Sequence, residues 1–129
     1  MTRGYDAPIP ILRSFDAEHA RAFYFDFLGF ELVFEHRFEP DMPLYMGIAR
    51  GACVLHLSEH YGDATPGSAV RIPVDDVHAF VAELNAKGHG HARPGKPRSM
   101  PWGMDEIALT DPAGNRLIFY TERDDETEQ

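Results

Sequence analysis

Two segments of the chain place apolar residues at helical spacing between a start signal and a stop signal. The first segment begins at Asp16 and ends at Gly29, and the second begins at Asp75 or Asp76 and ends at Gly88. An aspartate side chain caps the first N–H groups of a helix, and glycine readily takes the left-handed conformation that ends one. The apolar positions are Ala20, Phe23, Tyr24, Phe27 and Leu28 in the first segment and Val77, Phe80, Val81 and Leu84 in the second. With Asp75 as the second start, starts and stops repeat at one spacing, which indicates two duplicated modules packed together.

The residues around each predicted helix have the composition of β-strands, with β-branched and aromatic side chains between glycine and proline turns. The predicted strands are 9–13, 30–38, 44–50 and 53–59 in the first half, and 69–74, 91–98, 104–110 and 115–122 in the second. Residues 91–98 contain prolines and are expected to form an edge strand. Each half is therefore predicted to be β-α-β-β-β, which makes the chain an α+β protein.

We expect one domain over residues 1–129, with an internal division. Module one covers about 7–59, a linker about 60–67 and module two about 68–122. An acidic tail, 123–129, follows the last strand.

Alternation along the strands separates the side chains into two faces. One face is apolar and can be covered by the helices; it contains Leu55, Leu57, Ile72, Val74, Ile107, Leu109, Leu117 and Phe119. The other face is mixed, and contains Ile9, Ile11, Val54, His56, Ser58, Ala69, Arg71, Glu106, Ile118 and Tyr120. An apolar surface with a few polar groups is typical of a ligand pocket, so the mixed face is the predicted binding surface.

Charge and composition exclude several other functions. The net charge of −9 and the short, proline-broken basic cluster at 93–98 argue against binding nucleic acid. No apolar run approaches the roughly 20 residues that cross a membrane, and the N-terminus has no secretory signal pattern, so we expect a cytoplasmic protein without a membrane partner. Cys53 is the only cysteine, which excludes an internal disulfide or a thiolate zinc cluster. Ser-His-Asp, phosphate-loop and dinucleotide motifs are also missing.

Several short motifs resemble one known family. These are the duplication itself, Phe23-Tyr24 followed by Leu28-Gly29-Phe30, the strand 54–60, Pro101-Trp102-Gly103, and the turn 111–115. Together, over about 7–122, they resemble the vicinal-oxygen-chelate superfamily of glyoxalases, bleomycin-resistance proteins and dioxygenases, and most closely the bleomycin-resistance type. The resemblance implies a curved mixed sheet and a homodimer that exchanges an edge strand, with a ligand groove at the interface.

The resemblance also identifies where metal-dependent members of the superfamily hold their ion. The four positions correspond to Ile9, His56, Ala69 and Ile118. Only His56 has a side chain that coordinates a metal, so we expect no metal and no cofactor. The leading hypothesis is a non-catalytic protein that sequesters a drug or metabolite, for example a cationic glycopeptide. The alternatives are a metal-dependent enzyme with an altered site around His56 and Glu106, and a structural or regulatory partner module.

Nine residues are the candidates for ligand contact, and none is assigned a catalytic role. They are Phe34, Phe38, Tyr45, His56, Ser58, Arg71, Trp102, Glu106 and Tyr120. Trp102 lies in a loop, where it either stacks on a planar ligand or plugs the space between modules. Arg71 and Glu106 either orient a polar ligand or pair with each other. His56 is either a pocket group or a satisfied core histidine.

Overall fold

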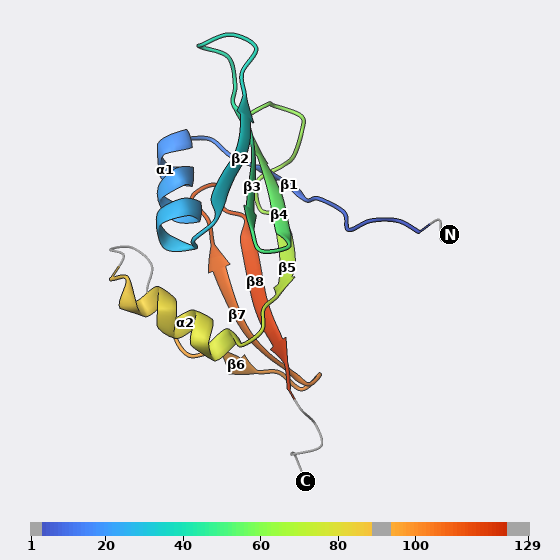
Figure 1. Ribbon diagram of the computed structural model, residues 1–129, viewed down its shortest axis with the longest axis vertical. Coiled ribbons are helices and arrows are strands. Elements are labelled where there is room, and N and C mark those ends of the chain that lie inside the picture. Colours follow the sequence, from blue (N-terminus) through green and yellow to red (C-terminus); the bar gives the residue numbers. More distant parts are fainter. Residues whose placement is uncertain (1–3, 89–93, 124–129) are drawn as a thin grey trace.

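The computed structural model describes residues 4–88 and 94–123, and Figure 1 shows their arrangement. The first module contains β1 (Ile11–Arg13), α1 (Ala17–Arg21), its π-helical continuation η1 (Ala22–Phe27), β2 (Glu31–His36), β3 (Tyr45–Arg50) and β4 (Cys53–Ser58). The second contains β5 (Ala69–Pro73), α2 (Val77–Ala86), β6 (Arg98–Ser99), β7 (Met104–Thr110) and β8 (Arg116–Glu122). The predicted α+β class and the β-α-β-β-β order of each half are confirmed.

Each module builds one mixed four-stranded sheet. The strand orders are β1-β4-β3-β2 and β5-β8-β7-β6, so equivalent strands occupy equivalent places. The first strand of each module pairs in parallel with the last, and the remaining pairs are antiparallel.

The helix boundaries follow from the residues that predicted them. Asp16 accepts hydrogen bonds from the N–H groups of Glu18 and His19, and Asp76 does the same for His78 and Ala79. The second cap is thus Asp76, not Asp75. Gly29 and Gly88 follow the helices with φ of 81° and 64°, in the left-handed region that favours glycine.

The first helix differs from the prediction in its second half, where η1 widens into a π-helix. The N–H of Leu28 reaches back five residues to the carbonyl of Phe23, at 3.0 Å. Phe23, Tyr24 and Phe27 are nevertheless all buried. Over two turns the apolar pattern fits both kinds of helix, so periodicity could not separate them.

Proline explains two of the differences in strand length. The predicted strand 9–13 begins only at Ile11, after Pro10, and the predicted 91–98 contributes only Arg98–Ser99, after Pro97. Proline has no N–H to give to a ladder of hydrogen bonds. Residues 91–93 of that prediction, and 124–129 of the predicted tail, lie outside the described residues.

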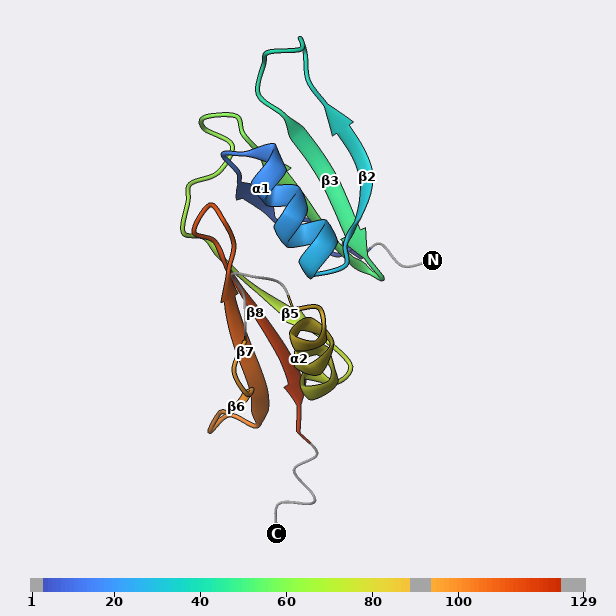
Figure 2. The same cartoon turned by 90° about the vertical axis from the view of Figure 1, so that its left-hand side faces the viewer.

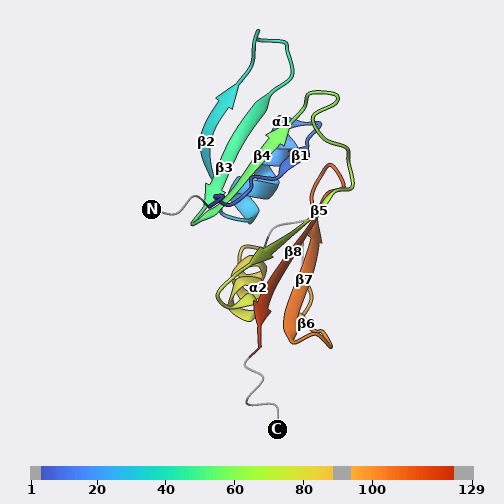
Figure 3. The same cartoon turned by 90° about the vertical axis from the view of Figure 1, so that its right-hand side faces the viewer.

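Both helices lie on the same side of the two sheets. Figure 2 shows α1 and α2 in front of the strands, and Figure 3 shows the opposite side, where the strands face the viewer. The helix side carries the hydrophobic core, which includes Leu55, Leu57, Ile72, Leu117 and Phe119, with Val74, Ile107 and Leu109 packed against it. We call the other side, which no helix covers, the open face.

The two modules are joined by polar contacts as well as by this shared core. The Tyr24 hydroxyl donates to Oδ2 of Asp111 at 2.6 Å, and Nδ2 of Asn115 donates to the carbonyl of Arg13 at 2.8 Å. Burial, followed by the nearby Asp111 carboxylate, raises the pKa of Tyr24 far above its ordinary value. The first helix is therefore fixed to the β7–β8 turn of the second module. Among the described residues, no helix has the length and apolarity needed to span a membrane.

Candidate functional site

Three predicted residues form an aromatic cluster on the open face of module one. Phe34 comes from β2, Tyr45 from β3 and His56 from β4. The Tyr45 hydroxyl lies 2.7 Å from Nδ1 of His56, and the Phe34 ring packs edge-on against His56 with centroids 5.3 Å apart. Desolvation, followed by the Asp63 carboxylate, raises the pKa of Tyr45. The cluster offers a ligand an apolar ring surface next to a hydrogen-bonded imidazole.

Gly47 makes this cluster possible, and the sequence reasoning missed it. It lies opposite Phe34 in the β2–β3 ladder. A Cβ built on Gly47 would lie 2.8 Å from Cδ2 of Phe34 and closer still to Cε2. The Phe34 ring therefore lies directly on the backbone of β3. A glycine inside a strand often marks such a close approach, and that was the available signal.

Four other predicted residues meet on the open face of module two. Oε2 of Glu106 accepts hydrogen bonds from Nη2 of Arg71 at 2.6 Å and from the indole Nε1 of Trp102 at 2.8 Å. The Arg71 guanidinium lies 4.5 Å from the centroid of the Tyr120 ring. The hydrogen bond from Arg71, with a further contribution from Trp102, lowers the pKa of Glu106. The result is an ionised, mostly buried carboxylate that holds one arginine and one indole.

This geometry answers two questions that the sequence left open. Arg71 and Glu106 pair with each other. Trp102 is 56% exposed, so it does not plug the space between the modules. Its N–H edge is bound while much of its ring remains accessible.

The remaining two of the nine candidates make other contacts. Ser58 is fully buried, and its hydroxyl donates to Asp63 and accepts from the N–H of His60, so it stabilises the loop after β4. Phe38 lies beyond the end of β2, is 72% exposed and packs edge-on against His36. The predicted strand 30–38 is shorter in the structure, because β2 ends at His36. The assignment of Phe38 to the same cleft as Phe34 stays a prediction.

The four positions that hold a metal in metal-dependent relatives carry little coordinating chemistry here. Ile9 is exposed before β1, Ala69 is exposed on β5, and Ile118 is half-buried on β8. At His56 one ring nitrogen already contacts Tyr45. Within residues 4–88 and 94–123, no three His, Cys, Asp or Glu side chains gather as a metal site. These residues do not fit a divalent ion.

Two cavities of the described chain lie outside the two clusters. One of about 120 Å³ lies between the start of α1 and the β7–β8 turn, and one of about 250 Å³ lies between the start of β2 and the end of β3. None of the nine candidates lines either of them.

Two β-α-β-β-β modules, with helices on one side and an open face on the other, define the class of glyoxalase and bleomycin-resistance folds. The chain belongs to the glyoxalase superfamily, because the family described as "Glyoxalase superfamily protein" matches residues 2–126.

Solved structures give the same result. A bleomycin-binding protein complexed with bleomycin is 27% identical, with a TM-score of 0.70 over 92% of this chain and 100% of that one. A bleomycin resistance determinant encoded on transposon Tn5 is 26% identical, with a TM-score of 0.70 over 92% and 98%. The bleomycin-binding protein of Streptomyces verticillus, complexed with copper(II)-bleomycin, is 29% identical, with a TM-score of 0.67 over 92% and 97%. A search of curated protein sequences gives no match.

Proposed function

We propose that this chain is a non-catalytic binding protein that sequesters a bleomycin-like small molecule on its open face. The observation that carries the proposal is Trp102, whose indole N–H is bound by Glu106 while the ring is 56% exposed. A ring anchored at one edge is a preformed stacking surface for a planar ligand. The likeness to bleomycin-binding proteins supports the same ligand class.

Sequestration fits the chemistry of the two clusters. The polar groups that they contain, the Tyr45–His56 pair and the Arg71–Glu106 pair, already bond to each other. Stoichiometric binding needs shape, stacking surface and a few polar contacts, and it needs no activated nucleophile or metal. The alternative, a metal-dependent enzyme, would need metal ligands at the four positions described above. Of these, only His56 has a coordinating side chain. Metal analysis of purified protein is expected to find no stoichiometric divalent ion, and one ion per chain bound through His56 would favour the enzyme instead.

The binding form is proposed to be a homodimer that closes a groove over the two clusters. The open face exposes apolar side chains that a second copy would cover, including Ile9 at 46%, Ile11 at 41% and Phe34 at 41%. The segment before β1 extends away from the body of the molecule, which supports exchange of an edge strand between protomers (Figure 1). Sedimentation at micromolar concentration is expected to give twice the chain mass, and a monomer there would contradict the proposal.

A titration with metal-free bleomycin tests the function. Trp102 is the only tryptophan, so saturable quenching of its fluorescence would report binding at this loop. In calorimetry, Trp102→Ala is expected to weaken binding roughly tenfold or more, because stacking and contact area are both lost. The matched control is Tyr61→Ala, which removes an exposed aromatic residue outside both clusters.

Recovery of unaltered bleomycin after incubation with the protein supports sequestration rather than a reaction. Absence of binding, or equal affinity of the Trp102 variant, would contradict the proposal.

A further inference from the structure

The loop that presents Trp102 is a tight connection between β6 and β7. The N–H of Met100 donates to the carbonyl of Met104 at 2.7 Å, and the N–H of Gly103 donates to the carbonyl of Met100 at 3.1 Å. Gly103 has φ of 87°, which the turn needs and other residues rarely adopt. These bonds close the loop on itself, but they do not fix it to the rest of the module.

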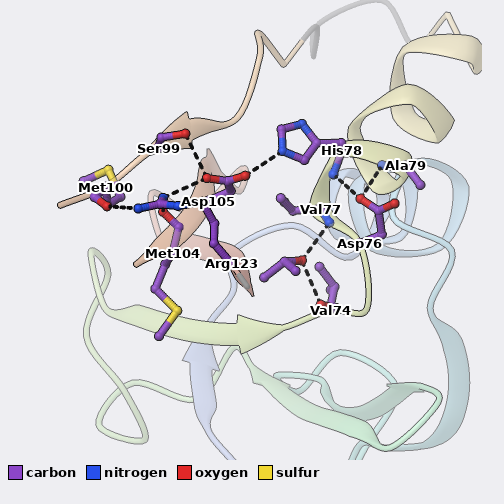
Figure 4. Close-up of polar contacts among 11 residues, drawn as sticks. Val74, Asp76, Val77, His78, Ala79, Ser99, Met100, Met104, Asp105 and Arg123 are labelled. Carbon is purple, nitrogen blue, oxygen red and sulfur yellow. Dashed lines mark hydrogen bonds and ion pairs between the residues drawn. The ribbon is translucent and has the colours of Figure 1, made fainter. Parts of the chain in front are cut away.

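Arg123, directly after β8, supplies that attachment. Its Nη2 donates to the carbonyl of Met100 at 3.0 Å and its Nη1 to the carbonyl of Met104 at 2.9 Å, so one guanidinium holds both ends of the loop (Figure 4). Its backbone N–H also donates to the carbonyl of Gly103 at 2.8 Å. A planar group with several N–H donors can make such a bridge, whereas the compact ammonium of lysine cannot reproduce it.

Asp105 in turn orients Arg123. Its Oδ1 accepts from Nη1 of Arg123 at 3.0 Å and from Ser99 at 2.9 Å, while its Oδ2 lies 2.8 Å from Nε2 of His78 (Figure 4). The His78 hydrogen bond, followed by those from Arg123 and Ser99, lowers the pKa of Asp105. His78 lies on α2, so this carboxylate also connects the loop to the helix.

Asp105 and Glu106 are neighbours on β7 and point to opposite sides of the sheet. Asp105 contacts α2 and, through Arg123, the loop backbone, whereas Glu106 holds the Trp102 indole on the open face. Trp102 is thus fixed twice, by its backbone from one side and by its ring edge from the other.

We propose that Arg123, oriented by Asp105, is a positioning residue that holds the Trp102 loop in its ligand-binding conformation. Its effect on affinity rests on the proposed function, while its effect on the loop does not. A side chain already held in place need not lose freedom when the ligand binds, so a fixed Trp102 lowers the cost of association.

The test compares Arg123→Met with Arg21→Met. Arg21 forms an exposed pair with Glu35 at 2.5 Å on module one, so its variant loses a guanidinium–carboxylate contact far from the loop. In the ligand-free protein, Arg123→Met should lower the fluorescence anisotropy of Trp102 and raise its quenching by acrylamide, and Arg21→Met should change neither. Metal-free bleomycin should bind the Arg123 variant roughly threefold to tenfold more weakly, since one immobilised side chain must now be ordered on binding.

Two further variants separate positioning from general stability. Arg123→Lys keeps the charge without the two-carbonyl bridge, so it should loosen Trp102 almost as much as Arg123→Met does. Asp105→Asn keeps the side-chain shape and should also lower the anisotropy of Trp102. It keeps the test decisive if Arg123→Met fails to fold.

Unchanged Trp102 anisotropy in folded variants of Arg123 and Asp105, even with a lower melting temperature, would overturn the proposal. So would unchanged bleomycin affinity where Trp102 is loosened. If wild type itself does not bind bleomycin, the proposed function fails, and the ligand-free measurements still decide whether Arg123 holds the loop.

Discussion

Glu106 and Trp102 are four residues apart, and Oε2 of Glu106 accepts the indole N–H of Trp102 at 2.8 Å. The same oxygen also accepts from Arg71 at 2.6 Å. One carboxylate thus determines both the place of the ring edge and the place of the positive charge next to it. This relationship makes Glu106 the residue whose replacement should change the open face of module two most.

Replacing Glu106 is expected to release Trp102 without unfolding the protein. Glu106→Ala removes the acceptor for both the indole and the guanidinium, so acrylamide quenching of Trp102 should rise and bleomycin affinity should fall by roughly threefold or more. Glu106→Gln keeps a neutral acceptor and should give a smaller effect. Glu35→Ala, which removes the exposed partner of Arg21, is the control. Equal quenching in wild type and Glu106→Ala would show that the loop alone positions the ring.

Gly47→Ala is expected to disturb the aromatic cluster of module one. The new methyl group would overlap the Phe34 ring, so either the ring or the strand must shift. Overpacking of this kind lowers the free energy of unfolding by about 1–3 kcal/mol, measurable by urea denaturation. Gly95→Ala is the control, because nothing lies within 4 Å of a Cβ there.

A double-mutant cycle tests the stated cause. In a Phe34→Ala background the ring is gone, so adding Gly47→Ala should cost much less than it does in wild type. If the cost is the same in both backgrounds, the destabilisation comes from the strand backbone and not from Phe34.

Local rules predicted the fold from the sequence. The helices begin at aspartates, Asp16 and Asp76, whose side chains cap the first N–H groups, and they end at glycines, Gly29 and Gly88, which take the left-handed conformation. Both effects depend on only a few adjacent residues. Alternation then assigned Arg71 and Glu106 to one side of the sheet, where the structure has them.

The contacts that complete the site could not be predicted in this way. Alternation gives a face but not the register between strands, so it left open whether Arg71 reaches Glu106. Arg123 and Asp105 escaped notice because their partners are loop carbonyls and a helix residue distant in sequence. The predicted strand 30–38 ran past His36 because the end of β2 depends on the hairpin beyond it, which periodicity does not record.

Tyr24→Phe is expected to weaken the connection between the modules. The Tyr24 hydroxyl donates to Oδ2 of Asp111, a buried carboxylate oxygen. In the variant this oxygen still accepts a hydrogen bond from Nδ2 of Asn115, at 3.0 Å. Loss of one hydrogen bond to a charged group should lower the free energy of unfolding by about 1–3 kcal/mol. Tyr61→Phe is the matched control, since Tyr61 is 84% exposed. Urea midpoints that shift equally in both variants would contradict a special role for the Tyr24–Asp111 bond.

The stability of module two is expected to fall in acid through Asp105 and Glu106. The hydrogen bond from His78 is the main cause that lowers the pKa of Asp105, and the hydrogen bond from Arg71 is the main cause that lowers that of Glu106. A carboxyl group with a lowered folded-state pKa binds fewer protons in the native protein than in the unfolded chain. Its stabilising contribution is therefore fully present above the unfolded pKa of about 4, and it is lost as the pH falls through the lower, folded value.

Urea midpoints measured from about pH 6 down through about pH 3 span this window. Wild type should lose stability steadily below about pH 4, and Asp105→Asn combined with Glu106→Gln should flatten that loss, because neither amide titrates. Glu35→Gln, at an exposed ion pair that solvent screens, should leave the slope close to that of wild type. Trp102 fluorescence recorded in the same samples adds a local readout, since protonation of Glu106 weakens its hold on both Arg71 and the indole. Parallel pH profiles for wild type and the double variant would mean that the acid sensitivity arises at other carboxylates.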